Sequence, residues 1–189
     1  WGSPAAAPTL LPVVVSSASD SDASVRTARA CVNKPLEIKQ ETILLARLVI
    51  EFTLANPLFH LSTVITDNTT TINTTPKAMT VTNPGTVEER DPTITLTGPL
   101  SNTVLTNSTN GCVLTYTGTI ADGETVSIAT DANGSYTALK NGVTNVIGNV
   151  THSGDSALMV IDPGANTFSI ADGTHSTGTV KISFYAPFL

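Results

Sequence analysis

From Ala78 to the C-terminus, the chain alternates between apolar and polar residues in short runs separated by strong turn signals. Such alternation places the apolar side chains on one face of a β-strand. Many of the breaks contain Asn-Gly, Asp-Gly or Pro-Gly pairs, which form tight turns because asparagine and glycine adopt positive φ at low cost. The runs cover residues 79–83, 93–97, 112–117, 125–130, 135–139, 143–147, 158–161, 167–170 and 179–185.

This spacing of strands and turns predicts an all-β domain, an antiparallel β-sandwich or barrel. About nine strands is typical of a jelly roll. The inward-facing positions of the runs predict a core, and its members are Val81, Ile94, Leu96, Leu114, Tyr116, Val126, Ile128, Leu139, Val146, Leu158, Val160, Phe168, Ile170, Val180, Ile182 and Phe184.

The sequence VIDPGANTFSI (160–170) predicts the last hairpin but one of this domain. Pro163 fixes φ at the first corner of the turn, and Gly164 allows positive φ at the second corner, as a type II turn requires. We expect the runs on either side, 158–161 and 167–170, to pair with each other and to form a rigid edge of the sandwich.

The part of the chain before Ala78 is less regular. Residues 35–41 alternate as a half-exposed strand does, and residues 48–54 place Leu48, Ile50, Phe52 and Leu54 on one face of a second strand. The Thr-rich stretch 66–76 has almost no core-forming residues and indicates a linker or a long hairpin, which we take as the domain boundary. The predicted organisation is a reduced or partial N-terminal β domain at 1–62, a linker or long loop at 63–77 and the sandwich at 78–189.

Composition narrows the possible functions. The chain is 40% hydrophobic and 13% charged, with a net charge of −6. Threonine makes up about a sixth of the residues, and this β-branched residue suits a half-exposed strand surface with little charge repulsion between copies. Nine Lys and Arg form no phosphate-binding stripe, so we predict no nucleic-acid partner. No segment has the length of a membrane span, and we predict no membrane insertion. The first residue, Trp1, is consistent with a processed chain or a fragment.

The histidines do not form a recognisable catalytic or metal-binding motif. His60, His152 and His175 are not at ligand spacing, and the last two lie in loop-like segments. The stretch HSGD places His152, Ser153 and Asp155 side by side. A Ser-His-Asp triad is instead assembled from distant parts of a fold, so we interpret these residues as a solvated loop.

Other polar clusters are equally weak as functional signals. Asp131 and Asn133 precede Gly134 as in a calcium loop, but Gly142 stands where the loop needs Glu, so we predict a hairpin turn. The run EERD (88–91) is expected to be a salt-bridged or solvated surface. The five N-x-S/T matches, at Asn68, Asn73, Asn107, Asn133 and Asn149, are no argument for glycosylation in a chain so rich in Ser and Thr.

The two cysteines, Cys31 and Cys112, have no neighbouring Cys or His, and we interpret them as thiols, not as a disulfide or a zinc site. Taken together, the residues predict no catalytic, cofactor-binding or metal-binding site, no cofactor and no enzymatic activity.

Six segments, in order along the chain, resemble the distal tail proteins and related minor tail proteins of siphophages. They are LVIEFTLANPLF (48–59), VTNPGTVEERDPTITLTGP (81–99), LTYTGTIADGETVSIATD (114–131), LKNGVTNVIG (139–148), IDPGANTFSI (161–170) and GTVKISFYAPFL (178–189). The sequence departs from the family pattern at Ala186 and Phe188, where the family often has Arg.

The resemblance implies a jelly-roll or galectin-like C-terminal domain and a structural role in the virion, at the tail tip or baseplate. It implies a ring, commonly a hexamer, that connects the tail tube to the host-adsorption apparatus and contacts the tail hub and receptor-binding proteins. Assembly would take place in the host cytoplasm. The family's N-terminal domain, which usually makes the ring, is longer than residues 1–62 here.

Two other classes of function compete with this hypothesis. One is a β-sandwich module that binds a carbohydrate or a receptor, which requires an exposed aromatic platform or an Asp/Asn cluster. The candidates for such a platform are Trp1, Tyr116, Tyr136 and Tyr185. The other is a different virion β protein, either a capsid decoration protein or a tail-tube subunit. An enzyme is the least favoured class of function.

Overall fold

The computed structural model describes the backbone of residues 11–15, 26–32, 37–42, 45–49 and 52–54, and then residues 58–131, 134–153, 157–173 and 177–189. Side chains are described from Leu58 onward, with the exception of Asp67 and Asn68. The chain divides into two compact units, one containing residues 1–62 with Leu189 and one containing residues 63–188. The described residues contain β-strands and one short 3-10 turn, η1 (Ile147–Asn149).

The described residues of the first unit form six short strands. They are β1 (Leu11–Val15), β2 (Arg26–Val32), β3 (Glu37–Thr42), β4 (Leu45–Val49), β5 (Phe52–Leu54) and β6 (Phe59–Leu61). β2 pairs with β1, β5 and β6, whereas β3 and β4 form a separate hairpin. The single strand predicted at 48–54 is therefore wrong, because β4 and β5 pair with different partners. Alternation along a segment indicates a strand but not where the strand changes partner.

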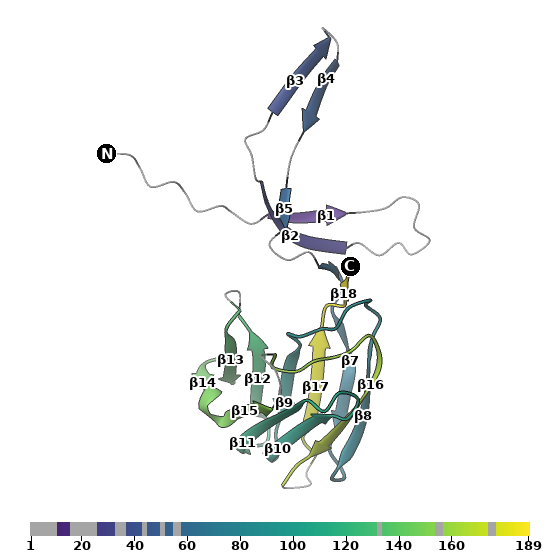
Figure 1. Ribbon diagram of the computed structural model, residues 1–189. Coiled ribbons are helices and arrows are strands. Elements are labelled where there is room, and N and C mark those ends of the chain that lie inside the picture. The colour runs from purple at the N-terminus through teal and green to yellow at the C-terminus, as the bar shows by residue number, and fades with distance from the viewer. Residues whose placement is uncertain are drawn as a thin grey trace, which may run out of the picture. The chain divides into compact units, whose positions relative to one another are not determined.

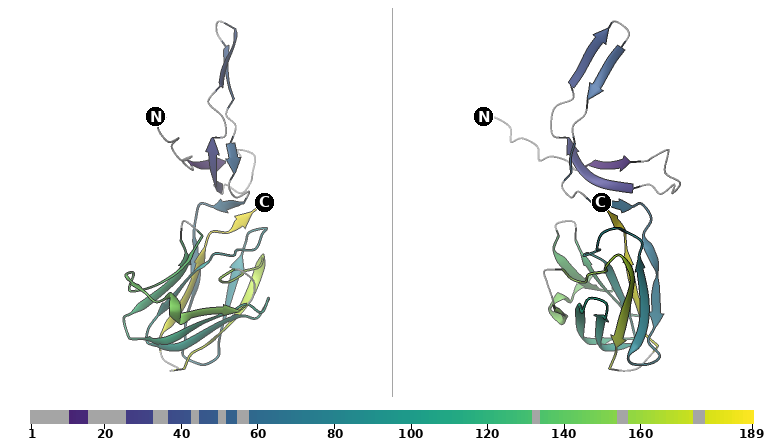
Figure 2. Two further views of the ribbon diagram at one scale, coloured as in Figure 1. Left: turned by 60° about the vertical axis from the view of Figure 1, so that its left-hand side comes forward. Right: turned by 45° about the vertical axis from the view of Figure 1, so that its right-hand side comes forward.

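The second unit is a sandwich of two antiparallel sheets packed face to face (Figures 1 and 2). Eleven strands that belong to it are β7 (Ile65–Thr71), β8 (Lys77–Asn83), β9 (Thr93–Thr97), β10 (Leu100–Asn107), β11 (Val113–Ile120), β12 (Thr125–Thr130), β13 (Tyr136–Lys140), β14 (Thr144–Asn145), β15 (Val150–Ser153), β16 (Gly164–Ala171) and β17 (Thr179–Phe184). A further short strand, β18 (Pro187–Phe188), follows them.

The two sheets differ in size and strand order. The six-stranded sheet has the order β14-β13-β12-β9-β17-β7, and the five-stranded sheet has the order β15-β11-β10-β16-β8. All their described pairings are antiparallel. The predicted fold class is thus confirmed: an all-β antiparallel sandwich that follows a smaller β-rich N-terminal part.

The core lies between the two sheets and is built from the inward faces of the strands. β8, β9, β16 and β17 bury every second residue, as a strand that covers a core must. Thirteen of the predicted core residues are buried, and Val81, Ile94, Phe168, Ile170 and Ile182 have no exposed surface. The predicted set fails at Leu139, Val146 and Val160, which are only half-buried.

The failure at Leu139 follows from strand register. Ala138 pairs with Ile128, which points into the core, and directly opposed residues share a face of the sheet. Ala138 is therefore the buried residue, with no exposed surface, while Leu139 pairs with Ser127 on the outer face. A shift of one residue exchanges the two faces, and the size of the side chain does not decide which face is inside.

The stretch predicted as a linker, 63–77, is wrong in its main part. β7 occupies Ile65–Thr71 and pairs with β17 at the end of the six-stranded sheet. Threonine at an exposed sheet edge needs few apolar neighbours, because its β-branched side chain suits a pleated surface. The low apolar content of this stretch therefore indicated an edge strand as much as a linker.

The sequence patterns also missed β10, which is eight residues long. Its register shifts between Ser101 and Thr103, and Asn102 between them has a positive φ of 50°. This bulge resets the inside-outside alternation. Two of the inward positions, Thr103 and Asn107, are polar, so the strand lacks the apolar period that identified its neighbours.

The predicted hairpin at 158–170 does not form. Residues 158–161 make no strand: Ile161 forms one isolated bridge with Glu89, and β16 pairs with β8 and β10. Met159 and Ile161 are buried, whereas Val160 is half-buried. Gly164 does have the predicted positive φ, 89°, but it is the first residue of β16 and not the corner of a hairpin between the two runs.

Candidate functional site

The histidine group that the sequence singled out is only partly described. His152 is exposed on β15, and its ring meets the ring of Tyr136 edge-on, with 5.7 Å between centroids. Ser153 follows it on the same strand and is exposed, so the predicted solvent exposure is correct for these two residues and the predicted loop is wrong. Asp155 and His175 lie outside the described residues. His60 lies on β6, in the other unit.

The stretch from Asp131 to Ser135 joins β12 to β13, as the predicted hairpin turn does, and Asn133 lies outside the described residues. The Asp131 side chain accepts a hydrogen bond from the Ser135 amide at 2.9 Å, and the Asp131 amide donates to the Ser135 carbonyl at 2.8 Å. These bonds close the hairpin. Within the residues that the structure describes, no three His, Cys, Asp or Glu side chains gather in a way that could hold a metal ion.

The acidic run EERD has two environments instead of the single solvated one that we expected. Glu88 forms a salt bridge with Arg90 at 2.6 Å, with both side chains substantially exposed. Glu89 points the other way, and only 7% of its surface is exposed to solvent. The prediction is wrong for Glu89, because its backbone pairs with Ile161 in both directions, which turns its side chain inward.

Burial raises the pKa of Glu89 from 4.5 to about 7, since removal from water disfavours the charged carboxylate. The nearby charge of Asp91 acts in the same direction. The Asp91 amide opposes the shift, because it donates to Glu89 Oε1 at 2.6 Å. Such a pKa fits general acid-base chemistry, but the Glu89 side chain is buried and one of its oxygens is occupied by the Asp91 amide. We interpret Glu89 as a structural carboxyl.

A second polar centre consists of three buried asparagines, and we call it the asparagine clasp: Asn83, Asn107 and Asn166. Asn83 Nδ2 donates to the carbonyl of Ile161 at 3.1 Å, and Asn107 Nδ2 donates to the carbonyl of Val160 at 2.9 Å. The asparagine clasp thereby holds the segment 157–163 against the strand ends of the five-stranded sheet.

Asn166 completes the asparagine clasp. Its side chain bonds both backbone groups of Asp162: Nδ2 donates to the carbonyl at 2.7 Å and Oδ1 accepts from the amide at 3.0 Å. Asn107 Nδ2 also donates to Asn166 Oδ1, at 3.1 Å. Fully paired amides inside a protein fix one arrangement of the backbone. This role was not predicted from the sequence, although asparagines beside Pro-Gly turns and at strand ends commonly bond to the nearby backbone.

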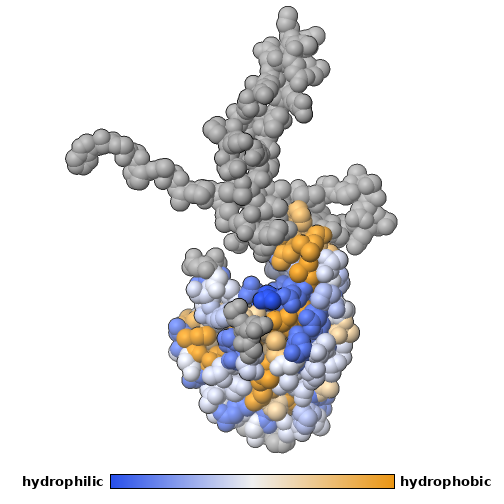
Figure 3. Space-filling model, viewed as in Figure 1, coloured by the Kyte–Doolittle hydropathy of each residue, from blue (hydrophilic) through white to orange (hydrophobic). Residues whose placement is uncertain are grey.

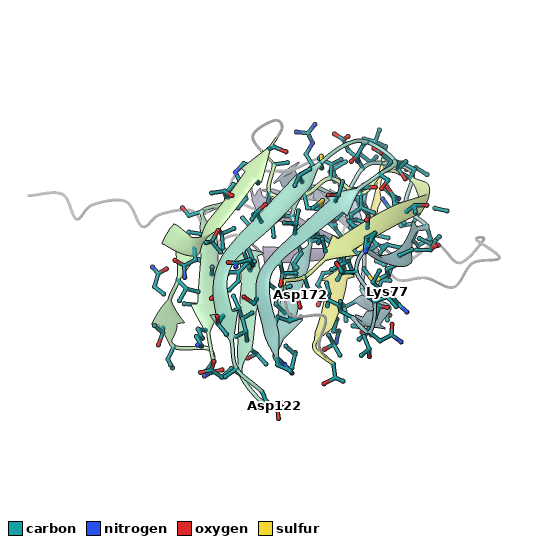
Figure 4. The ribbon with its side chains drawn as sticks, turned by 90° about the horizontal axis from the view of Figure 1, so that it is seen from below. Lys77, Asp122 and Asp172 are labelled. Atoms are coloured by element: carbon teal, nitrogen blue, oxygen red, sulfur yellow. The ribbon has the colours of Figure 1, made fainter. Side chains whose placement is uncertain are left out.

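Asp172 makes a third buried polar contact, at the end of β16. Its side chain accepts from the Ser101 amide at 2.7 Å and from the Thr103 hydroxyl at 3.3 Å. Its own amide donates to the Thr75 hydroxyl. Figure 4 shows Asp172 within the outline of the sandwich, whereas Asp122 projects from the rim. The contacts support the bulge of β10, and they are again structural.

At the surface, Glu124 carries the other perturbed carboxyl that the structure describes. Lys140 Nζ lies 2.6 Å from its carboxylate, and the Ala121 amide donates to the same oxygen at 2.8 Å. Both contacts favour the charged form and lower the pKa of Glu124. This pair ties the turn after β11 to the end of β13.

The remaining predicted residues are scattered. Cys112 is a half-buried free thiol, and Cys31 lies on β2, where only the backbone is described. Tyr116 is buried, Tyr136 contacts His152, and Tyr185 is 49% exposed. Among the N-x-S/T positions, Asn107 is fully buried in the asparagine clasp and is therefore no glycan acceptor in the folded chain.

Most of the surface that Figure 3 displays is pale, neither strongly hydrophilic nor strongly hydrophobic, as a Thr-rich surface must be. Several apolar areas interrupt it, and one of them lies on the side where Figure 1 places β13 and β14. Val143, which is 80% exposed, and Ile147 lie next to β14. Within the described residues there is no helix long and apolar enough to cross a membrane.

Comparisons with known proteins give a structural neighbour but no sequence family. No family model matches the chain, and no curated protein matches it. Among solved structures, the fold is similar to the SPP1 Dit (gp 19.1) protein, described as a paradigm of the hub adsorption apparatus in phages that infect Gram-positive bacteria. The TM-score is 0.59 at 13% identity, over 94% of this chain and 65% of that chain. The likeness therefore concerns the fold.

Proposed function

We propose that this chain is a structural component of a phage tail tip, similar to a distal tail protein, and that its role is assembly, with no catalytic step. The observation that carries the proposal is the similarity of fold to SPP1 Dit over 94% of the chain, which includes the β-rich N-terminal part as well as the sandwich. The six sequence segments that resemble distal tail proteins support it independently, because they come from sequence order and not from coordinates.

The sandwich has properties that suit such a role. Its polar interior is fixed by the asparagine clasp and by Asp172, so the domain is a rigid body. Its outside is rich in threonine and low in charge, which reduces repulsion between packed copies. We propose as partners further copies of the chain in a ring, commonly a hexamer in this family, together with tail-tube, tail-hub and receptor-binding proteins.

The test is negative-stain electron microscopy of the purified chain, combined with immunogold labelling of phage particles. We expect rings of the purified chain and label at the tip of the tail, in the virion. A monomer that leaves particles unlabelled and binds a carbohydrate on a glycan array would overturn the proposal. Label along the whole tube or on the capsid would favour a tail-tube or decoration subunit.

A further inference from the structure

The sandwich has four edge strands, and they differ in how well they resist pairing with another chain. β14 is two residues long, and β15 is four residues long. β7 carries Asp67, and its pairing with β17 contains a register shift between Ile182 and Phe184. Short length, charge and irregularity all make an edge a poor template for a further strand.

β8 is neither short nor irregular, and its one charge lies at its first residue. It is seven residues long and pairs with β16 without a register shift from Lys77 to Asn83. It ends the order of the five-stranded sheet, so within the described chain no other strand pairs along its outer edge (Figure 1). It contains no proline, and Lys77, at its first position, is its single charged residue. A long, regular edge of this kind presents unpaired backbone amides and carbonyls to another strand.

We propose that the edge of β8 pairs in antiparallel fashion with β8 of a second copy of this chain, about a two-fold axis at Thr80. This contact would join two five-stranded sheets into one continuous sheet. Two-fold contacts between identical chains are the commonest in oligomers, because one surface must fit only itself.

The residues of β8 are complementary to themselves in this register. Thr80 opposes Thr80, and Met79 opposes Val81, so threonine pairs with threonine on the outer face and apolar residues meet on the inner face. Such pairs stabilise antiparallel strands. Met79, at 8% exposure, is the least buried of the core residues and gains cover from the added strand.

The charges on β8 are compatible with a second copy as the occupant. In this register Lys77 lies opposite Asn83, so the two lysines do not oppose each other. Each copy has a net charge of −6, and the one charge on the strand is positive. Because Lys77 lies at the end of each strand, the middle of the contact around Thr80 carries no charge and no like charges oppose each other there. The inference stands independently of the phage hypothesis, because it uses only this strand.

The test exchanges Thr80 for charged residues in the full chain and measures self-association by sedimentation equilibrium over a range of concentrations. Thr80→Lys and Thr80→Glu each place like charges opposite one another across the two-fold axis, and each should weaken the contact about fivefold or more. An equimolar mixture of the two variants should restore it, because the opposed charges then attract.

The matched control is Thr117→Lys on β11, a central strand of the same sheet, where the threonine is also exposed. This change should leave association unaltered. Hydrogen exchange gives a second measurement: amides of residues 77–83 should exchange more slowly as concentration rises. A chain that stays monomeric, or an oligomer unaffected by Thr80→Lys and Thr80→Glu, would overturn the inference. Rings that persist in Thr80→Lys would leave the tail-tip proposal intact while removing this contact.

Discussion

Two different kinds of polar contact hold the segment 157–163 in the sandwich. The asparagine clasp holds it with neutral amides at Val160, Ile161 and Asp162. Glu89 holds it through a backbone pair with Ile161 and, in doing so, buries a carboxyl. Neutral amides can be buried at low cost when they are paired, whereas a carboxylate must either give up its charge or lose solvation. One contact is therefore insensitive to pH and the other is not.

The largest effect should come from Glu89. Its pKa is about 7 in the folded chain, against the ordinary value of 4.5 that applies when the chain is unfolded, so the folded state holds its proton more tightly. Below about pH 4.5 the Glu89 carboxyl is protonated in both the folded and the unfolded chain, so its burial costs no ionisation energy and the folded state has its full stability. As pH rises to about 7, only the unfolded state ionises, and about 3 kcal/mol of stability is lost.

Glu89→Gln should remove this pH dependence, since an amide has no proton to lose and still accepts from the Asp91 amide. Denaturant unfolding at pH 4.5 and pH 8 measures the difference. At pH 8 the variant should have a larger free energy of unfolding than the native chain. Glu88→Gln, the same change at the exposed neighbour, is the control and should alter the pH profile little. If the stability of Glu89→Gln and that of the native chain changed with pH in the same way, the carboxyl of Glu89 would not have a raised pKa.

Asn107→Ala should have a smaller effect that does not change with pH. The change leaves the partly buried Thr109 amide without its acceptor and removes one of the two donors to the buried Asn166 Oδ1. Unpaired buried groups cost about 2 kcal/mol. Thermal unfolding at two pH values measures the loss, and a loss that varies with pH would show that the asparagine clasp and Glu89 act as one unit.

Asn110→Ala should have the smallest effect. Asn110 Nδ2 donates to the same carbonyl, of Val160, at 3.0 Å, and also to Asp162 at 3.1 Å, but its side chain is exposed. Water replaces an exposed hydrogen bond, so we expect a change within about 0.5 kcal/mol. If Asn110→Ala lost as much stability as Asn107→Ala, the difference in burial between the two asparagines would not explain their contributions.

The fold class could be predicted because its signal is local. Alternation in β8, β9, β12 and β17 and the turn pairs between strands are properties of neighbouring residues. Asn141 and Gly142, for example, both have positive φ, 51° and 74°, as their sequence predicts for a tight hairpin. The polar centres could not be predicted, because Asn83, Asn107 and Asn166 are far apart in the chain and only the sheet order brings them together.

What the sequence by itself determined is the class of the fold, the positions of most sandwich strands and most of the core, since each depends on short periods and on turn chemistry. Tertiary structure decided three other features: the register that buries Ala138 instead of Leu139, the inward turn of Glu89, and the partner of the segment before Asp162-Pro163-Gly164. Pairing is a long-range choice between strands, and a run of alternating residues does not specify its partner.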